Sequence, residues 1–498
     1  MDNERKCIKR EKFCNHRIPL IVAISLVLGV IIGYALSSCH LIFPLVIAII
    51  LCVVIFVFLM FFFDAKFCVV IFFIILFFFV GFISVSLKVY GNISRSFDGY
   101  KEISGEARVK SVSVDGDEYT VIAENFRSGD LNGGIRLKTY TDLSVGDIIK
   151  IDGKAKYVSC EYFNIHPLKN SYDFEAYFAS VTIVKKTADF FSSISSKAET
   201  ALMSNMNETE GGICVALLLG DTRYVSQELY EKFSLSGVAH IFAVSGLHVG
   251  FLATAFSFFF AKIGVKGLLK TFLLSLISFL YAGFCGFSVS SLRAVIMCTI
   301  LGFSTSIGLK YDFLNSISLA LVVVVTIFPE SLFSYGTLLS FGAVYSIAFL
   351  SGPFSKIYSF LPQKIGTACS VSTSAFLGTF PIIAYMCGRV SLFTVVFNVI
   401  TIPFVGVLFI FLFVGGWLTT IFSALAFLLK PAEILSGFTA YVYSKISVSC
   451  QVVNIIPAIF STILLYIVLF IISDRFNFPK SLKVGATISL PFCLLAFM

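Results

Sequence analysis

The chain has 498 residues, a mean hydropathy of +0.93 and 57% hydrophobic residues, whereas only 13% of its residues are charged. A water-soluble core cannot absorb that much apolar surface, so the composition excludes a soluble globular protein and indicates a polytopic α-helical membrane protein. Part of the modest net charge of +8 lies in a basic run over the first 17 residues, which predicts a cytoplasmic N-terminus. The 13 cysteines include no Cys-x-x-Cys pair, so neither a zinc ribbon nor a disulfide scaffold is expected.

The first part of the chain, residues 1–91, is predicted to hold the N-terminal tail and three membrane spans. Residues 18–36, 41–63 and 67–90 are each long enough to cross about 30 Å of hydrocarbon. With the basic tail inside, three crossings place the chain outside the cytoplasmic membrane from residue 91 onward.

Residues 92–190 carry charges of both signs, and their apolar residues recur with a period of two, which predicts an extracytoplasmic β domain. The Asp115-Gly116 pair and the cluster Asn132–Gly134 predict turns. Four or five short strands in this length suit a small β-barrel such as an OB-fold. The predicted strands are 103–114, 118–126, 134–140 and 147–158.

Aromatic side chains in this predicted barrel have two interpretations. They would stack on the bases of a single strand, as in many OB-folds, or they would fill the barrel core. Basic and acidic residues nearly balance here, so no phosphate-binding footprint is visible. The residues in question are Tyr119, Phe126, Tyr140 and Tyr157.

Residues 191–498 return to membrane composition and are predicted to form a multi-span domain. An amphipathic stretch at 190–206 is expected to lie at the membrane interface. Some of the apolar segments that follow are too short or too rich in glycine to cross alone, and re-entrant segments are expected among them. The candidate spans are 210–220, 238–260, 267–285, 289–307, 313–328, 332–350, 366–386, 391–413, 414–429, 434–452, 455–473 and 482–498.

The span 238–260 contains polar residues that are costly at membrane depth and therefore indicate function, namely His240, Ser245 and His248. A helix break at Ser245 and Gly246 would move His248 onto an unwound stretch that lines a pore. The alternative is that these side chains make hydrogen bonds between helices.

Asp221 follows a Leu-Leu-Gly sequence and is expected to pair with Arg223 or to cap the next helix, with a role in gating as the alternative. A zinc site built from Asp221, His240 and His248 is a weaker interpretation because the spacing matches no ligand pattern.

Four further polar residues lie in apolar segments. Arg293 and Arg389 are candidate phosphate contacts, although each would also be explained by reaching toward lipid headgroups. Asn315 and Asn398 are expected to make hydrogen bonds between helices.

Three ordered blocks resemble the ComEC family, the DNA-uptake channel of bacterial competence. They are ALLLGDTRYVSQELYEKFSLSGVAHIFAVSGLHVGFL (216–252), YAGFCGFSVSSLRAVIMCTILGF (281–303) and LGTFPIIAYMCGRVSLFTVVFNVITIPFVGVL (377–408). Upstream, VGDIIKIDGKA (145–155) is similar to the family's extracytoplasmic OB-like domain. The resemblance implies a channel in the bacterial inner membrane that passes single-stranded DNA into the cytoplasm. Its implied partners are the lipid bilayer, a periplasmic or surface DNA receptor, and a cytoplasmic ATPase or single-strand-binding protein.

The chain departs from the family pattern at Val289, where a proline is usual, and at Leu338, where a glutamine is usual. It has neither the His-x-His-x-Asp-His motif of the metallo-β-lactamase-like nuclease domain of long members nor a P-loop. The expectation is therefore a channel without an enzymatic activity or a cofactor. A secondary transporter of a small solute is the alternative. An intramembrane hydrolase using Ser245 and His248 is disfavoured because Val244-Ser245-Gly246 is not a nucleophile elbow.

Overall fold

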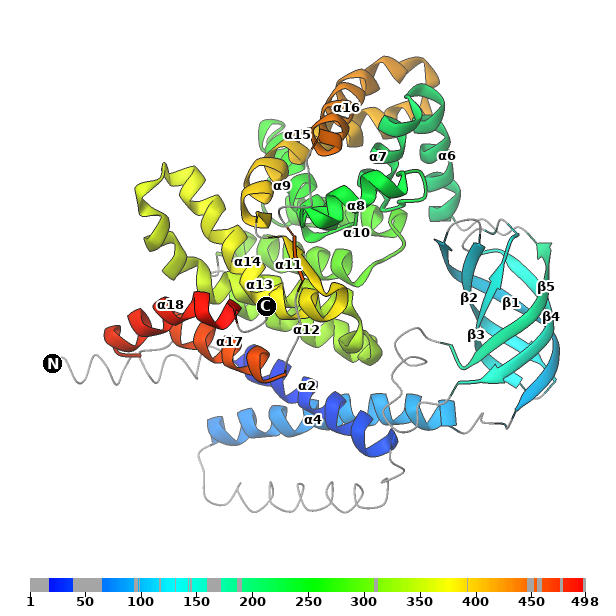
Figure 1. The fold of residues 1–498 in the computed structure, drawn as a ribbon, viewed down its shortest axis with the longest axis horizontal. Coiled ribbons are helices and arrows are strands. Elements are labelled where there is room, and N and C mark those ends of the chain that lie inside the picture. The colour runs from blue at the N-terminus through cyan, green and yellow to red at the C-terminus, as the bar shows by residue number, and fades with distance from the viewer. Residues whose placement is uncertain are drawn as a thin grey trace. The chain divides into compact units, whose positions relative to one another are not determined.

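The computed structural model describes most of the chain (Figure 1). The described residues are 18–38, 65–93, 97, 99–115, 118–129, 131–141, 143, 146–158, 172–185, 190–308, 312–391, 393–445, 452–454, 459–474 and 478–495. The basic N-terminal run and the predicted span 41–63 lie outside them. The chain forms two compact units, residues 1–193 with 318–334, and residues 194–317 with 335–498.

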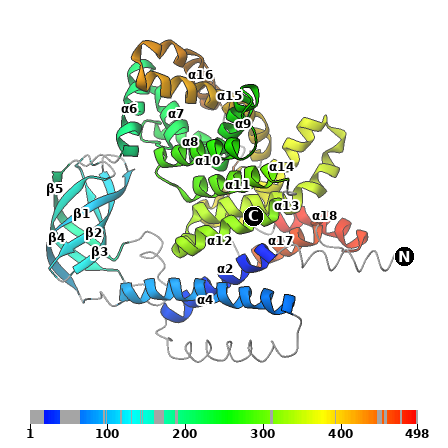
Figure 2. The ribbon, with the colours of Figure 1, turned by 180° about the vertical axis from the view of Figure 1, so that it is seen from behind.

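The first unit begins with two apolar helices, α2 (Ile18–Ser38) and α4 (Ala65–Ile93), which lie side by side in both views (Figures 1 and 2). Their contact is lined by Gly29, Gly33 and Gly81. A Cβ atom at Gly29 would lie 2.0 Å from the carbonyl oxygen of Phe78 on α4. Glycine therefore lets the two backbones touch, which is how helices associate where no water drives them together.

Five strands of the first unit form a closed barrel in the order β1-β2-β3-β5-β4. All neighbours are antiparallel except β3 and β5, which run parallel, so β5 crosses over to close the barrel. A five-stranded Greek-key barrel is the architecture of the OB-fold. The strands are β1 (Tyr100–Asp115), β2 (Glu118–Ser128), β3 (Leu131–Thr139), β4 (Ile148–Tyr157) and β5 (Phe174–Lys185).

The predicted strands match β1 to β4, but the turn predicted at Asn132–Gly134 was wrong. Ser128 pairs with Leu131, so the hairpin turns at Gly129, and Gly133 lies within β3. A Cβ atom at Gly133 would lie 2.2 Å from Oδ2 of Asp173, so this glycine permits close packing within the barrel instead of a turn.

The predicted aromatic residues of the barrel divide between core and surface. Phe126 is fully buried, and Tyr119 and Tyr157 pack against the same core. Tyr140 is exposed. The core-filling interpretation therefore holds for three of these four rings.

A buried asparagine ties the barrel to the end of α4. Asn92 is only 4% exposed, and its Nδ2 donates to Oδ1 of Asp173 at 2.8 Å. The hydroxyl of Tyr157, at the end of β4, donates to the backbone oxygen of Asn92 at 2.9 Å and lies 2.8 Å from Oδ1 of the same residue. The barrel is thus held to the helix by hydrogen bonds as well as by the chain itself.

The second unit is helical, with one pair of three-residue strands, β6 (Arg389–Ser391) and β7 (Val452–Asn454). Helix α12 (Phe313–Ile327) crosses the boundary between the units, and the short helix η3 (Pro329–Phe333) belongs to the first. The remaining helices are α6 (Phe190–Asn205), α7 (Glu208–Leu219), α8 (Gln227–Leu235), η2 (Ala239–Ile241), α9 (Gly246–Lys262), α10 (Gly267–Phe284), α11 (Val289–Ser306), α13 (Tyr335–Ile357), η4 (Tyr358–Phe360), α14 (Gln363–Cys387), α15 (Thr394–Ile421), η5 (Ser423–Leu429), α16 (Lys430–Lys445), α17 (Ile459–Ile472) and α18 (Lys480–Leu495).

Seven helical segments in the described part of the chain are long and apolar enough to cross a membrane. The chain is therefore a multi-pass membrane protein with a small β-barrel, as predicted. They are Ile18–Ser37, Val70–Ile93, Gly267–Phe284, Tyr335–Phe360, Gln363–Cys387, Thr394–Ile421 and Ser423–Lys445.

The predicted separation of spans 391–413 and 414–429 was wrong, because α15 continues to Ile421. Gly415 and Gly416, which lie just after the predicted boundary, are inside this helix. A Cβ atom at Gly415 would lie 2.8 Å from the carbonyl oxygen of Leu428 on η5, so this glycine serves close packing.

Candidate functional site

The chain between α8 and α9 is irregular and carries the polar residues singled out in the sequence. Gly237 adopts a positive φ of 77°, and a Cβ atom there would lie 2.2 Å from Oγ1 of Thr394. A short 3-10 helix at 239–241 follows, and α9 begins only at Gly246. The candidate span 238–260 is therefore continuously helical only from Gly246, and the predicted break at Ser245 and Gly246 coincides with the start of α9.

Ser245 and His248 form a capping box at the start of α9. The hydroxyl of Ser245 accepts a hydrogen bond from the backbone N–H of Leu247 at 3.2 Å. In return, Nδ1 of His248 accepts the backbone N–H of Ser245 at 3.2 Å. These bonds satisfy donors that a helix N-terminus leaves unpaired. His248 therefore belongs to the first turn of α9, and its predicted place on an unwound stretch was wrong.

The imidazole of His248 is 2% exposed and packs edge-on against Phe409 of α15, with ring centroids 4.8 Å apart. Because Nδ1 accepts the N–H of Ser245, the neutral ring carries its proton on Nε2. That Nε2 atom is buried and has no hydrogen-bond partner among the described residues. The capping role thus uses one ring nitrogen and leaves the other as a buried donor.

Arg293 of α11 lies against the same helix N-terminus. Its side chain is 6% exposed, so it does not reach toward headgroups. A Cβ atom at Gly246 would lie 2.7 Å from Nη2 of Arg293, so glycine at the first position of α9 makes room for the guanidinium. Within the described part of the chain, no carboxylate forms an ion pair with Arg293, and its Nε has no hydrogen-bond partner.

Helix α13 holds the guanidinium in place. Nη1 of Arg293 donates to the carbonyl oxygen of Ser340 at 2.6 Å, and the guanidinium carbon lies 5.7 Å from the ring centroid of Phe341. Neither Ser340 nor Phe341 was predicted from the sequence. Leu338, where the family pattern has a glutamine, lies two positions before Ser340 and is 38% exposed.

The structure therefore brings together four predicted residues, namely Ser245, Gly246, His248 and Arg293. Their arrangement places a buried cation beside the N-terminus of a 17-residue helix. Both carry positive electrostatic potential, and backbone N–H groups at a helix start favour anions. The arrangement is suited to an anion such as a phosphate group.

Asp221 lies elsewhere in the second unit and pairs with Arg223, as predicted. Nε of Arg223 donates to Oδ2 of Asp221 at 2.7 Å, and Nη2 lies 3.5 Å from Oε2 of Glu199 on α6. The hydrogen bond with Asp221 raises the pKa of Arg223. Tyr224 also donates to Glu199, and this hydrogen bond raises the pKa of Tyr224 to about 12. This cluster joins α6 to the loop that precedes α8.

The other predicted site residues do not join the cluster at α9 directly. His240 lies on η2 with its side chain exposed and Nδ1 3.2 Å from the carbonyl oxygen of Gly237. Arg389 is exposed at the start of β6, opposite Asn454 of β7.

The two predicted asparagines, Asn315 and Asn398, differ in their surroundings. The backbone N–H of Asn315 donates to Oδ1 of Asp312 at 3.1 Å, at the start of α12. Oδ1 of Asn398 is buried in α15 without a hydrogen-bond partner in the described ranges. The predicted hydrogen bonds from these side chains to other helices stay predictions.

The geometry does not form a hydrolytic triad. The hydroxyl of Ser245 lies 3.3 Å from Nδ1 of His248, but the other ring nitrogen faces no orienting carboxylate among the described residues. In the part of the chain that the structure describes, no group of three His, Cys, Asp or Glu side chains lies close enough to hold a metal ion.

These features define a polytopic helical membrane protein with a small β-barrel and a buried polar cluster at a helix start. A protein-family model described as competence protein matches residues 217–475, more than half of the chain. The chain belongs to this family, the ComEC family that its motifs resembled.

Among curated proteins, the chain is similar to ComE operon protein 3 of Bacillus subtilis (strain 168). The two are 31% identical over 193 residues, which is 39% of this chain and 24% of the relative. The matched region thus spans about a quarter of the length of that relative. No solved structure matches the chain.

Proposed function

We propose that the chain is a channel that passes single-stranded DNA across the bacterial inner membrane during natural transformation. Membership of the competence family supports a role in DNA uptake. The seven segments able to cross a membrane support a path through the bilayer.

The observation that carries the proposal is the burial of the Arg293 guanidinium, which extends from α11 and lies beside the N-terminus of α9. A charge buried without an opposite charge is costly, and a bound anion would offset this cost. Single-stranded DNA offers one phosphate per nucleotide. The guanidinium of Arg293 and the positive end of the α9 dipole would therefore hold one phosphate at a time as the strand passes. His248 would present its Nε2 proton to the same path, and Gly246 would keep the approach open.

The proposed arrangement of the chain follows the charge distribution and the composition. The tail and first spans at 1–91 would begin in the cytoplasm, and the barrel region at 92–190 would lie outside the membrane. Residues 191–498 would form the channel, with the helix at 190–206 on the membrane surface. A DNA receptor outside and an ATPase or a single-strand-binding protein inside would supply and draw the strand. In this proposal the chain is a channel and does not itself cleave DNA.

A transporter of a small anionic solute is the competing proposal, because a guanidinium at a helix start would hold any small anion. The two proposals differ in whether loss of the protein stops DNA at the membrane. A deletion strain of the native host is expected to bind labelled DNA at its surface and to accumulate none in the cytoplasm. Normal cytoplasmic accumulation in that strain would contradict the channel proposal.

Complementation of the deletion strain tests the site itself. Arg293→Gln is expected to lower uptake at least about tenfold, because a phosphate contact from a charged donor is lost. Arg293→Lys is expected to retain part of the uptake. Lys364→Gln removes one positive charge from an exposed position at the start of α14 and serves as the charge-matched control. Equal uptake by Arg293→Gln and Lys364→Gln at equal membrane abundance would refute the role of Arg293.

A further inference from the structure

The side chain of Phe178 on β5 points out of the barrel, although its position along the strand predicts that it points inward. Phe174 and Ala176 on the same strand face the barrel core, so a regular strand would also turn residue 178 inward. Phe178 is instead 97% exposed. A large apolar ring that is almost fully exposed, at a strand position that follows the buried Phe174 and Ala176, requires a specific cause.

The cause is a β-bulge between β4 and β5. Asp152 pairs with Ser180 and Lys154 pairs with Tyr177, so Phe178 and its neighbour face Gly153 alone. Phe178 adopts a positive φ of 51°, which bulky residues rarely adopt. A bulge adds one residue and re-aims the side chain, and such local strain clusters at functional positions.

Gly153 makes the bulge possible. A Cβ atom at this position would lie 2.7 Å from the Cα of Ala179, so any side chain there would push β5 away. The bulge, the strained phenylalanine and this glycine together turn one aromatic ring outward.

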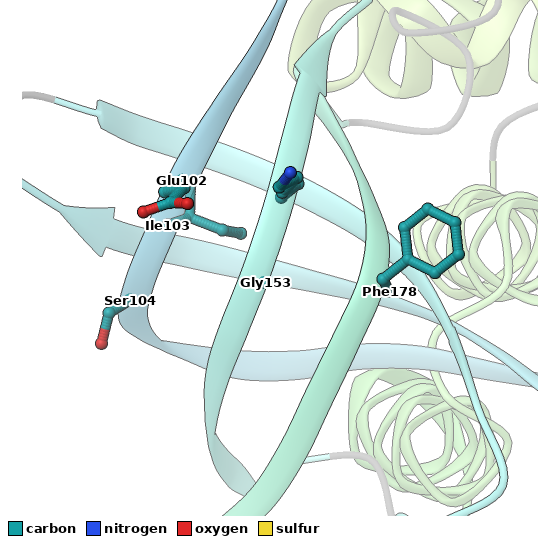
Figure 3. Close-up of a pocket in the computed structure, with 6 residues that line it drawn as sticks. Glu102, Ile103, Ser104, Gly153 and Phe178 are labelled. Carbon is teal, nitrogen blue, oxygen red and sulfur yellow. The ribbon is translucent and has the colours of Figure 1, made fainter.

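The ring borders a hollow of about 620 Å³ on the outer face of β1, β4 and β5. Figure 3 shows Phe178 on one side of Gly153, with Glu102 and Ile103 on the other. Ser104 and Lys154 complete the lining. The hollow is of the size that proteins use for small planar ligands.

One lysine lines the hollow, and two more lie beside it on the same strands. Lys101, Lys154 and Lys156 are exposed and make no ion pair within the described residues. The nearby carboxylate of Glu175 is already engaged by Arg136, with Nη1 and Oε1 2.7 Å apart. One ammonium group, that of Lys154, and one carboxylate, that of Glu102, therefore line the hollow, and the exposed Lys101 and Lys156 lie next along the same strands.

We propose that this hollow is a binding site for single-stranded DNA, in which a base stacks on Phe178 and the adjacent phosphates contact Lys154 and the exposed lysines beside it on β1 and β4. The inference rests on the proposed function for its choice of ligand. Stacking on an exposed aromatic ring beside basic residues is how proteins hold single strands without reading their sequence. The site lies on the bulged face of β1, β4 and β5, whereas OB-folds bind through the face of strands 2 and 3.

Glu102 argues against a membrane anchor as the role of this face. Its carboxylate would repel anionic headgroups, whereas in a complex with DNA it would accept a hydrogen bond from an N–H group of a base. A hollow beside the ring also suits a planar base, while a lipid anchor needs only a projecting ring.

The test uses the full chain in nanodiscs and measures the anisotropy of a labelled oligothymidylate. Phe178→Asn removes the ring with a residue that tolerates positive φ, and is expected to weaken binding about tenfold, as for the loss of one stacked base. Phe178→Trp is expected to retain the affinity. Tyr140→Asn removes an exposed ring elsewhere on the barrel and is expected to change nothing. An abasic oligomer of equal length is expected to bind the wild type and Phe178→Asn equally weakly.

Equal affinity of the wild type and Phe178→Asn for oligothymidylate would overturn the proposal, provided both proteins have the same thermal stability. Brominated lipids that quench Phe178→Trp in a Trp417→Phe background would also overturn it, by showing a membrane anchor. A failure of this proposal can be distinguished from a failure of the proposed function. Loss of this site alone would leave the effect of Arg293→Gln on uptake intact, whereas a chain unrelated to DNA would show neither effect.

Discussion

Replacing His248 separates its structural role from its role in the proposed pathway. His248→Leu removes the acceptor for the N–H of Ser245 and one edge-on aromatic contact, while it keeps an apolar side chain of similar volume. The lost capping bond costs about 1 kcal/mol and the aromatic contact about 1 kcal/mol. Leucine removes the unpartnered Nε2 atom, which offsets part of this loss. The net cost is about 1 kcal/mol, which a protein of ordinary stability tolerates.

The matched control is Ser245→Ala, which removes the other half of the capping box at a similar cost of about 1 kcal/mol and keeps the imidazole. Both variants are expected to insert at near-normal abundance. DNA uptake is expected to fall at least tenfold for His248→Leu and to follow abundance for Ser245→Ala. His248→Gln keeps an acceptor for the cap and an N–H donor, so it is expected to retain more uptake than the leucine variant. Uptake by His248→Leu equal to that by Ser245→Ala, at equal abundance, would refute a pathway role for the imidazole.

Three further predictions concern stability. Gly29→Ala is expected to lower the stability of the protein in detergent by about 2 kcal/mol, because its Cβ would collide with α4. Gly91→Ala on α4 is the control and should change little, because a Cβ there meets no atom within 4 Å. Equal thermal midpoints for the two variants would contradict the close contact between α2 and α4. Asn92→Ala is expected to cost about 1–3 kcal/mol and to speed limited proteolysis between α4 and the barrel, and an unchanged digestion rate would show that these hydrogen bonds do not hold the barrel. Glu199 raises the pKa of Tyr224 to about 12, above its ordinary value of 10.0, so the stabilisation from this hydrogen bond is complete below pH 10 and is lost as the pH rises to 12. Thermal unfolding should show a smaller loss over this range for Tyr224→Phe than for the wild type, and parallel pH profiles would exclude the contribution.

The sequence predicted most of the barrel because four of its strands alternate apolar and polar residues. It did not delimit the fifth strand, since the bulge at Phe178 interrupts the alternation in β5. Gly133 was predicted to lie in a turn, and Gly415 and Gly416 lie at a predicted span boundary, but the structure places them inside a strand and a helix. A glycine that permits close packing looks the same in a sequence as one that permits a turn, and only tertiary contacts distinguish the two.

The candidate site was predicted in its residues but not in its arrangement. The Ser-Gly sequence correctly indicated a helix break, but the capping box that keeps His248 helical depends on side-chain geometry. The burial of Arg293 could not be predicted, because its partner Ser340 lies 47 residues away on another helix. The spacing along the chain therefore gave the candidates, and the packing of α11 against α9 and α13 decided which of them meet.

The most direct test of the proposed pathway is to trap the strand at the site while it is passing. A photo-crosslinking amino acid would replace Leu247, which is 38% exposed and adjacent to Gly246, in cells that are taking up labelled DNA. The control position is Phe258, which is 65% exposed on the same helix and about 16 Å further along it. We expect single-stranded DNA to be crosslinked at position 247 and not at 258, and Arg293→Gln to lower the yield. Uptake at a normal rate without a crosslink at 247, or with equal yields at both positions, would contradict the proposed pathway.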